Sequence, residues 1–165
     1  MDAIFTRTSV RKYEDRPVEP EKLDKILRAA MAAPSAVNQQ PWEFYVVTDK
    51  SVLKDLAAAS PYTGMTADAP VAIVPCYRKS GLAVPEYAEI DLSLATENIL
   101  LEIEAQGLGG VMLGIAPFAD RMEKVAKAIS LPEHLAPFTV IPFGYPVGKT
   151  EQQNRYDEAR VHYID

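Results

Sequence analysis

The chain contains one cysteine, Cys76, among its 165 residues, so it cannot form an internal disulfide bond. This scarcity is typical of a reducing compartment. No apolar run approaches the ~20 residues that span a bilayer, and the start of the sequence lacks the basic end and apolar stretch of a signal peptide. We therefore expect a cytoplasmic protein without a membrane partner.

Metal and nucleotide motifs are also missing. The two histidines, His134 and His162, lie 28 positions apart with no cysteine cluster or His-Glu-x-x-His pattern, so we expect no metal site. The absence of a Walker loop, a nucleophile elbow and a Gly-x-Gly-x-x-Gly argues against triphosphatase, hydrolase and Rossmann functions. A net charge of −6 argues against nucleic-acid binding, which depends on lysine and arginine neutralising phosphates.

The composition indicates one folded domain, residues 1–165. Apolar residues make up 48% and charged residues 24%, and the length suffices for one well-buried core. The run Val71–Cys76 predicts a buried strand, with the cysteine packed in the core. Apolar spacing and turn residues predict helices over 20–33, 51–59, 86–105 and 120–129, and strands over 42–48, 70–76, 109–115, 138–143 and, briefly, 161–164.

The longest expected helix, residues 86–105, has two apolar stripes. One contains Ile90, Leu94, Leu101 and Ala105, and the other contains Leu92, Ala95, Ile99 and Ile103. A helix that is apolar on two sides is expected at the centre of a fold. It is either buried inside one domain, or it packs on its own core with one stripe and on a partner chain with the other.

Two short segments contain the candidate binding residues. In Arg7-Thr8-Ser9-Val10-Arg11, an extended backbone would point both guanidiniums and the Ser9 hydroxyl to one side, where they suit a phosphate monoester. The segment 34–42, Pro-Ser-Ala-Val-Asn-Gln-Gln-Pro-Trp, places carboxamides and a hydroxyl in a loop that suits the edge of a flat polar heterocycle. Alternatively, the first is a solvated basic edge strand, and the second is a polar loop that caps backbone groups.

Together the two segments resemble the FMN-dependent nitroreductase family. Its members open with Arg-x-Ser-x-Arg/Lys and have Pro-Ser-x-x-Asn-x-Gln-Pro-Trp after their first long helix. The resemblance continues through residues 91–101, 107–110, 144–146 and Arg155. It implies an α+β fold, with a mixed, largely antiparallel sheet between two helical layers. It also implies a homodimer whose C-terminal tail reaches the other subunit.

The resemblance also implies which residues contact FMN. Arg7, Ser9 and Arg11 would hold its phosphate and ribityl end, with Thr8 close by through its backbone. Asn38 and Gln40 would hydrogen-bond the polar edge of the ring or the ribityl chain from the opposite subunit. The remaining expected contacts are Pro34, Ser35 and Ala36 along the isoalloxazine, the backbone of Leu113 and Gly114 beside the flavin, and Lys149 and Arg155 at the phosphate. Alternatively, the strand that contains Leu113 and Gly114 is an ordinary buried strand without a role in binding.

The function that follows by resemblance is hydride transfer from NADH or NADPH, through FMN, to nitroaromatic or quinone acceptors with ping-pong kinetics. The flavin supplies the redox chemistry, so we assign no catalytic side chain. Two alternatives stay open. One is a homodimer that binds FMN for storage or sensing without turnover, and the other is a related reductive dehalogenase. Residues 77–86 are too few for the lid that dedicated enzymes of the family often have, which disfavours the dehalogenase.

Overall fold

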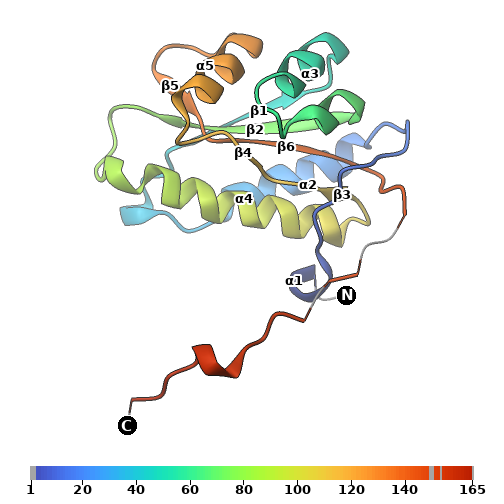
Figure 1. Ribbon diagram of the computed structural model, residues 1–165. Helices are drawn as coiled ribbons and strands as arrows, with labels where there is room; N and C mark the ends of the chain where they lie inside the picture. Colours follow the sequence, from blue (N-terminus) through green and yellow to red (C-terminus); the bar gives the residue numbers. More distant parts are fainter. Residues whose placement is uncertain (1–2, 149–150, 153, 165) are drawn as a thin grey trace.

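The computed structural model describes residues 3–148, 151–152 and 154–164. Its centre is a six-stranded sheet with the order β1-β2-β6-β3, in which β4 also pairs with β6 and β5 with β2, all antiparallel. Helices α3 and α5 cover one face and α2 and α4 the other (Figure 1). The expected α+β class and three-layer arrangement are confirmed. The bounds are α1 Ala3–Thr6, α2 Pro20–Met31, β1 Trp42–Val47, α3 Lys50–Ala57, β2 Val71–Arg78, α4 Ala88–Ala105, β3 Gly109–Gly110, β4 Leu113–Gly114, α5 Ala119–Ala128, β5 Leu135–Pro137 and β6 Thr139–Gly144.

Strand β2 is apolar on both faces because it lies between the two helical layers. Ala72, Val74 and Cys76 pack into the core under α3 and α5, while Val71 and Ile73 pack into the core over α2 and α4. This alternation follows from the two-residue period of a strand. The buried position predicted for Cys76 is confirmed, and burial raises the pKa of its thiol to about 12.

Helix α4 has the two faces that its sequence predicts. The stripe of Leu92, Ala95, Ile99 and Ile103 is buried, with at most 1% of each residue exposed. On the opposite stripe, Ile90 is 53% and Leu94 is 43% exposed. One stripe therefore belongs to the core, and the other presents apolar side chains at the surface of the single chain.

The region 109–115 differs from the single strand expected. Strands β3 and β4 pair with β6 in one register, in which Gly110 lies opposite Phe143 and Leu113 opposite Val140. Between them, Val111 N donates to Pro142 O at 3.3 Å. A proline has no N–H with which to return that bond, so the ladder is interrupted there.

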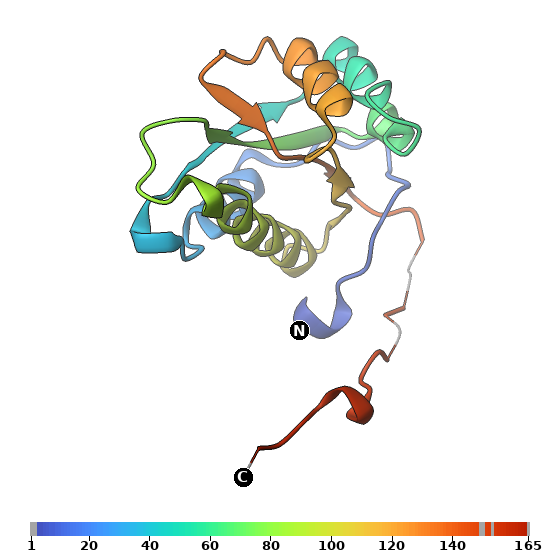
Figure 2. The ribbon, with the colours of Figure 1, turned by 60° about the vertical axis from the view of Figure 1, so that its left-hand side comes forward.

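The C-terminal segment is the other difference. The strand expected over 161–164 is wrong, since these residues have no regular structure and are exposed. The segment 154–164 leaves the body of the protein in both views (Figures 1 and 2), so it runs beside none of the strands of the described residues. Among the described residues, no helix is both long and apolar enough to cross a membrane.

Candidate functional site

The first candidate segment, residues 7–11, runs along the edge of the sheet beside β3. Ser9 forms a parallel bridge with Gly110, and Val10 N donates to Gly110 O at 3.0 Å. Arg7 Nε lies 3.8 Å from Glu97 Oε1 on α4, whereas the Arg11 side chain is exposed. Ser9 thus pairs with the edge of the sheet, and the two guanidiniums lie in different surroundings, so their common orientation toward one phosphate stays a prediction.

Two tyrosines fix this segment to the end of β6. The Tyr13 hydroxyl shares its proton between Val10 O and Pro142 O, at 2.7 and 3.0 Å. Burial raises the pKa of Tyr13 well above its usual value, so the hydroxyl remains a donor at physiological pH. The backbone continues the attachment, because Glu14 N donates to Tyr145 O at 2.9 Å.

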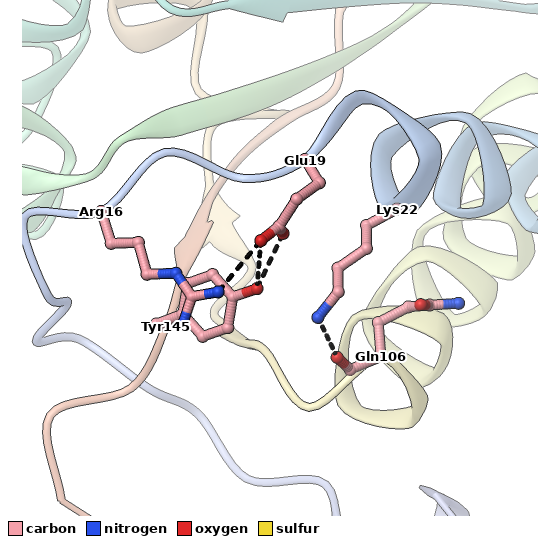
Figure 3. Close-up of polar contacts among 5 residues, drawn as sticks. All are labelled: Arg16, Glu19, Lys22, Gln106 and Tyr145. Atoms are coloured by element: carbon pink, nitrogen blue, oxygen red, sulfur yellow. Dashed lines mark hydrogen bonds and ion pairs between the residues drawn. The ribbon is translucent and has the colours of Figure 1, made fainter.

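Tyr145 is the centre of a polar cluster that we call the Tyr145 clamp (Figure 3), formed by Arg16, Glu19, Lys22, Gln106 and Tyr145. The tyrosine hydroxyl donates to both Glu19 carboxylate oxygens at 2.7 and 2.9 Å, and Arg16 Nη2 pairs with the same carboxylate at 3.0 Å. The Arg16 guanidinium also lies 3.7 Å from the centre of the Tyr145 ring. Lys22 Nζ donates to Gln106 O at 2.8 Å, which ties the start of α2 to the end of α4.

A cavity of about 500 Å³ brings three of the expected cofactor residues together, namely Arg11, Leu113 and Gly114. A Cβ added to Gly114 would meet a neighbouring atom only at 4.0 Å, so its backbone is open to a ligand. Two further lining residues, Tyr62 and Arg121, were missed by the sequence analysis because they belong to no recognisable motif. Among the described residues that line this cavity, two are arginines and none is acidic.

The second candidate segment is a turn with an unusual backbone. Val37, Asn38 and Gln40 have positive φ angles of 45°, 56° and 43°, which side-chain-bearing residues rarely adopt. Gln40 N donates to Ser35 Oγ at 3.0 Å, and Gln40 Nε2 donates to Asn38 Oδ1 at 2.8 Å. Such strain persists where surrounding contacts determine the conformation, and it clusters at binding sites.

Asp91 and Gln39 stabilise that turn by hydrogen bonds on its inner side, and neither was among the expected site residues. Asp91 is 2% exposed and accepts from Ala36 N at 2.9 Å and from Gln39 Nε2 at 2.8 Å. Gln39 Nε2 also donates to Val84 O at 2.9 Å, and Gln39 Oε1 accepts from Val84 N at 3.0 Å. Arg78 Nη2 donates to the carbonyls of Gln39 and Gln40. The inward carboxamide is therefore Gln39, while Asn38 and Gln40 are exposed.

The structure places most of the two candidate segments at opposite ends of α4. The turn 34–40 is attached near the start of the helix, at Asp91, and Ser9 and Val10 lie against Gly110, beyond its end, while Arg7 reaches back to Glu97. Eighteen helical residues span about 27 Å. The expected flavin residues of one chain therefore form two separate half-sites.

Arg155 lies outside both half-sites, and Thr8 belongs to the segment 7–11 but lines a different cavity from Arg11. Thr8 lines another cavity, of about 610 Å³, together with Glu104 and Glu151, whose carboxylates make it unsuitable for a phosphate. Arg155 is exposed in the segment that leaves the body and does not line the cavity that contains Arg11. Lys149 lies outside the described residues.

The 500 Å³ cavity fits one part of a flavin nucleotide. Its volume is within the range of small-molecule sites, it offers a guanidinium for an anion, and it exposes the Gly114 backbone to a flat group. The described residues contain no group of three or more potential metal ligands of the His, Cys, Asp and Glu types. The arrangement can therefore hold an anionic, partly planar organic ligand.

Comparisons with known proteins give matches in both sequence and fold. The family model for the Nitroreductase family matches residues 4–63 and 58–145. A protein of Methanothermobacter thermautotrophicus, provisionally named NADH dehydrogenase/NAD(P)H nitroreductase, is 44% identical over 98% of this chain and 85% of its own length. An FMN-dependent nitroreductase structure from Clostridium difficile has a TM-score of 0.91 at 30% identity, covering 99% of this chain and 98% of that one. A provisionally named nitroreductase of Desulfovibrio desulfuricans, solved in complex with FMN, has a TM-score of 0.81 at 27% identity, covering 99% and 95%.

Proposed function

Because the chain belongs to the nitroreductase family, it is an NAD(P)H-dependent flavin oxidoreductase with FMN as its cofactor, and we propose that it reduces nitroaromatic and quinone acceptors. The observation that carries the proposal is the open cavity in which Arg11 lies with the exposed Gly114 backbone. In the proposed ping-pong cycle, the nicotinamide leaves before the acceptor binds at the same face.

The roles of the chain's own residues follow from their positions. Arg11, with Ser9 and Arg7 in the same segment, would hold the phosphate and ribityl end, because guanidinium forks match phosphate oxygens. The backbone at Leu113 and Gly114 would lie along the ring. When bound, FMN supplies the hydride and electron chemistry, so the protein needs no side-chain acid or base in every turnover.

We expect the active form to be a homodimer. Within one chain the turn 34–40 lies near the start of α4 and Ser9 and Val10 lie beyond its end, so a second copy is needed to bring the carboxamides of Asn38 and Gln40 to a flavin held beside Arg11. The exposed stripe with Ile90 and Leu94 offers an apolar surface for that copy. The C-terminal segment 154–164 leaves the body with Tyr163 83% exposed, which suits an arm that packs on the partner.

The test of the redox function uses the protein purified without added flavin. We expect an oxidised-flavin absorption spectrum, its bleaching by NADH or NADPH without oxygen, and its recovery with menadione or a nitroaromatic. A flavin that stays oxidised with both nucleotides would favour a non-catalytic FMN-binding protein. A colourless protein that fails to take up FMN would refute the cofactor site.

A charge reversal tests the phosphate end. Arg11→Glu should expel FMN because it places a carboxylate against the phosphate. Arg28→Glu is the matched control, since Arg28 is an exposed residue of α2 that pairs with Asp24. Normal flavin content in Arg11→Glu would overturn the assignment of this segment.

Analytical ultracentrifugation tests the proposed homodimer, and a flavin-loaded monomer would refute it.

A further inference from the structure

The cavity that contains Arg11 has a second cation, Arg121, which the proposed flavin contacts do not use. The chain as a whole has a net charge of −6, yet the described lining of this cavity has two arginines and no carboxylate. The neighbouring Asp120 is one position away on α5, and residues one apart on a helix do not face each other. The cavity is therefore locally positive within an acidic protein.

Arg121 is held in place before any ligand arrives. Its Nη1 donates to Gly114 O at 2.9 Å, and its guanidinium carbon lies 4.1 Å from the centre of the Phe118 ring and 5.7 Å from that of Tyr62. Stacking on aromatic rings orients the guanidinium plane. The group is in the first turn of α5, so its backbone is fixed as well.

This arrangement leaves Arg121 able to bind an anion. A guanidinium has five N–H donors, and the bond to Gly114 uses one of them. None of the ion pairs found among the described residues includes Arg121. The nearby walls contain Tyr62, Met65 and Met112, which suit an aromatic ring rather than a sugar.

We propose that Arg121 recognises the carboxylate of the electron acceptor, and that the preferred acceptors are nitro- or quinone-type aromatic rings that bear a carboxylate. This inference rests on the proposed function, because it assigns a substrate class to the same cavity. A single fork-shaped cation beside apolar walls matches one aromatic carboxylate. Arg11 would remain with the cofactor phosphate.

Calorimetry on the purified holoprotein tests the subsite without turnover. The probes are benzoate and its neutral isostere benzamide, and the readout is the ratio of their dissociation constants. We expect the wild type to prefer benzoate, and Arg121→Gln to reduce that preference about tenfold or more, as loss of a charged hydrogen-bonding partner implies. Lys124→Gln is the matched control, because it removes the same charge from an exposed position on α5. Its ratio should equal that of the wild type.

A kinetic readout uses the same variants. The ratio of kcat/KM for 4-nitrobenzoate to that for menadione should fall about tenfold in Arg121→Gln and stay constant in Lys124→Gln. Arg121→Lys keeps the charge without the fork and should give intermediate ratios. It replaces Arg121→Gln as the test if that variant fails to fold.

The outcomes separate the two proposals. An unchanged benzoate-to-benzamide ratio in Arg121→Gln would overturn the carboxylate subsite, while NADH-driven menadione reduction by the wild type would still support the proposed function. A wild type that holds FMN but shows no turnover with NADH or NADPH would refute the proposed function, and the calorimetric ratio of that FMN-loaded protein would still decide the subsite. A loss confined to NADPH, with the benzoate ratio intact, would instead assign Arg121 to the nucleotide phosphate and overturn the inference.

Discussion

Gly109→Ala should displace the segment 7–11, which we propose to hold the FMN phosphate, although the substitution lies outside that segment. A Cβ at position 109 would lie 2.5 Å from Val10 Cγ2 and 2.7 Å from Val10 Cβ. Carbon atoms pack best at about 3.5 to 4.0 Å. Gly109 is fixed by pairing with Gly144, so Val10 is the residue that must move, by about 1 Å. Ser9 and Arg11 are bonded to it on either side and must follow.

The close contact between Gly109 and Val10 should lower both the thermal stability of the variant and its affinity for FMN. Overpacking of this kind costs about 1 to 3 kcal/mol, which lowers Tm by roughly 2 to 12 °C for a chain of this size. Binding groups must be held within about 0.5 Å, so a displacement of about 1 Å should weaken FMN binding by about 10- to 100-fold. Fluorescence titration of the flavin-free protein with FMN, together with thermal melting, measures both.

Gly107→Ala supplies the matched control two residues away. Gly107 has a φ of +74° and nothing within 4 Å of its added Cβ, so the change costs about 1 to 2 kcal/mol of backbone strain but leaves Val10 in place. It should lower Tm and keep FMN affinity. Val10→Ala removes the contact at 2.5 Å, so Gly109→Ala should cost less in that background. Tight FMN binding by Gly109→Ala would refute the role given to this close approach.

Three further results are expected. In Asp91→Asn, either Ala36 N or Gln39 Nε2 loses the carboxylate oxygen that accepts its hydrogen bond, so the free energy of unfolding should fall by about 1.5 to 3 kcal/mol in melts at fixed protein concentration. An equal loss of stability in Glu86→Gln, a substitution at an exposed position, would contradict this. The hydrogen bond from Tyr145 is the largest cause that lowers the pKa of Glu19 from 4.5 to about 2. The ionised Glu19 therefore stabilises the fold fully above pH 4.5, and this contribution is lost as the pH falls toward 2. Tyr145→Phe should flatten that acid dependence of the urea midpoint, and an unaltered profile would argue against the clamp. The buried Cys76 thiol should react with a disulfide reagent at pH 8 only after unfolding, and rapid reaction of the native protein would contradict its position.

The sequence predicted the elements in which a repeated pattern determines burial. The two stripes of α4 and the uninterrupted apolar run of β2 each follow from one period, 3.6 or 2 residues, so neighbouring positions reinforce one another. Boundaries that depend on another strand were not predictable in this way. The break between β3 and β4 comes from Pro142, about 30 positions further along the chain. The strand expected over 161–164 failed because a β-type sequence still needs a strand edge beside it.

The candidate site shows the same division. Local motifs indicated the segments 7–11 and 34–40 as candidates for a phosphate and a heterocycle, and these roles stay predictions. They could not give Asp91, because its bonds to Ala36 and Gln39 join positions 55 and 52 residues apart. They also gave no means of telling that Gln39 points inward while its neighbours Asn38 and Gln40 are exposed, since this depends on positive φ angles in the turn.

The separation of the two half-sites has a definite cause in how α2 packs on α4. Three bonds join these helices and their ends in antiparallel order, from Lys22 to the carbonyl of Gln106, from Asn98 to the carbonyl of Ala29, and from Ala36 to Asp91. As the residue number rises from 22 to 36 along α2 and the turn after it, the bonded position falls from 106 to 91 along α4. The chain must therefore travel the length of α4 between residue 11 and residue 36. Segments only 23 residues apart in sequence therefore do not meet in one copy. In the homodimer that we propose, a mutation in the turn should impair the flavin that we assign to the Arg11 of the partner copy.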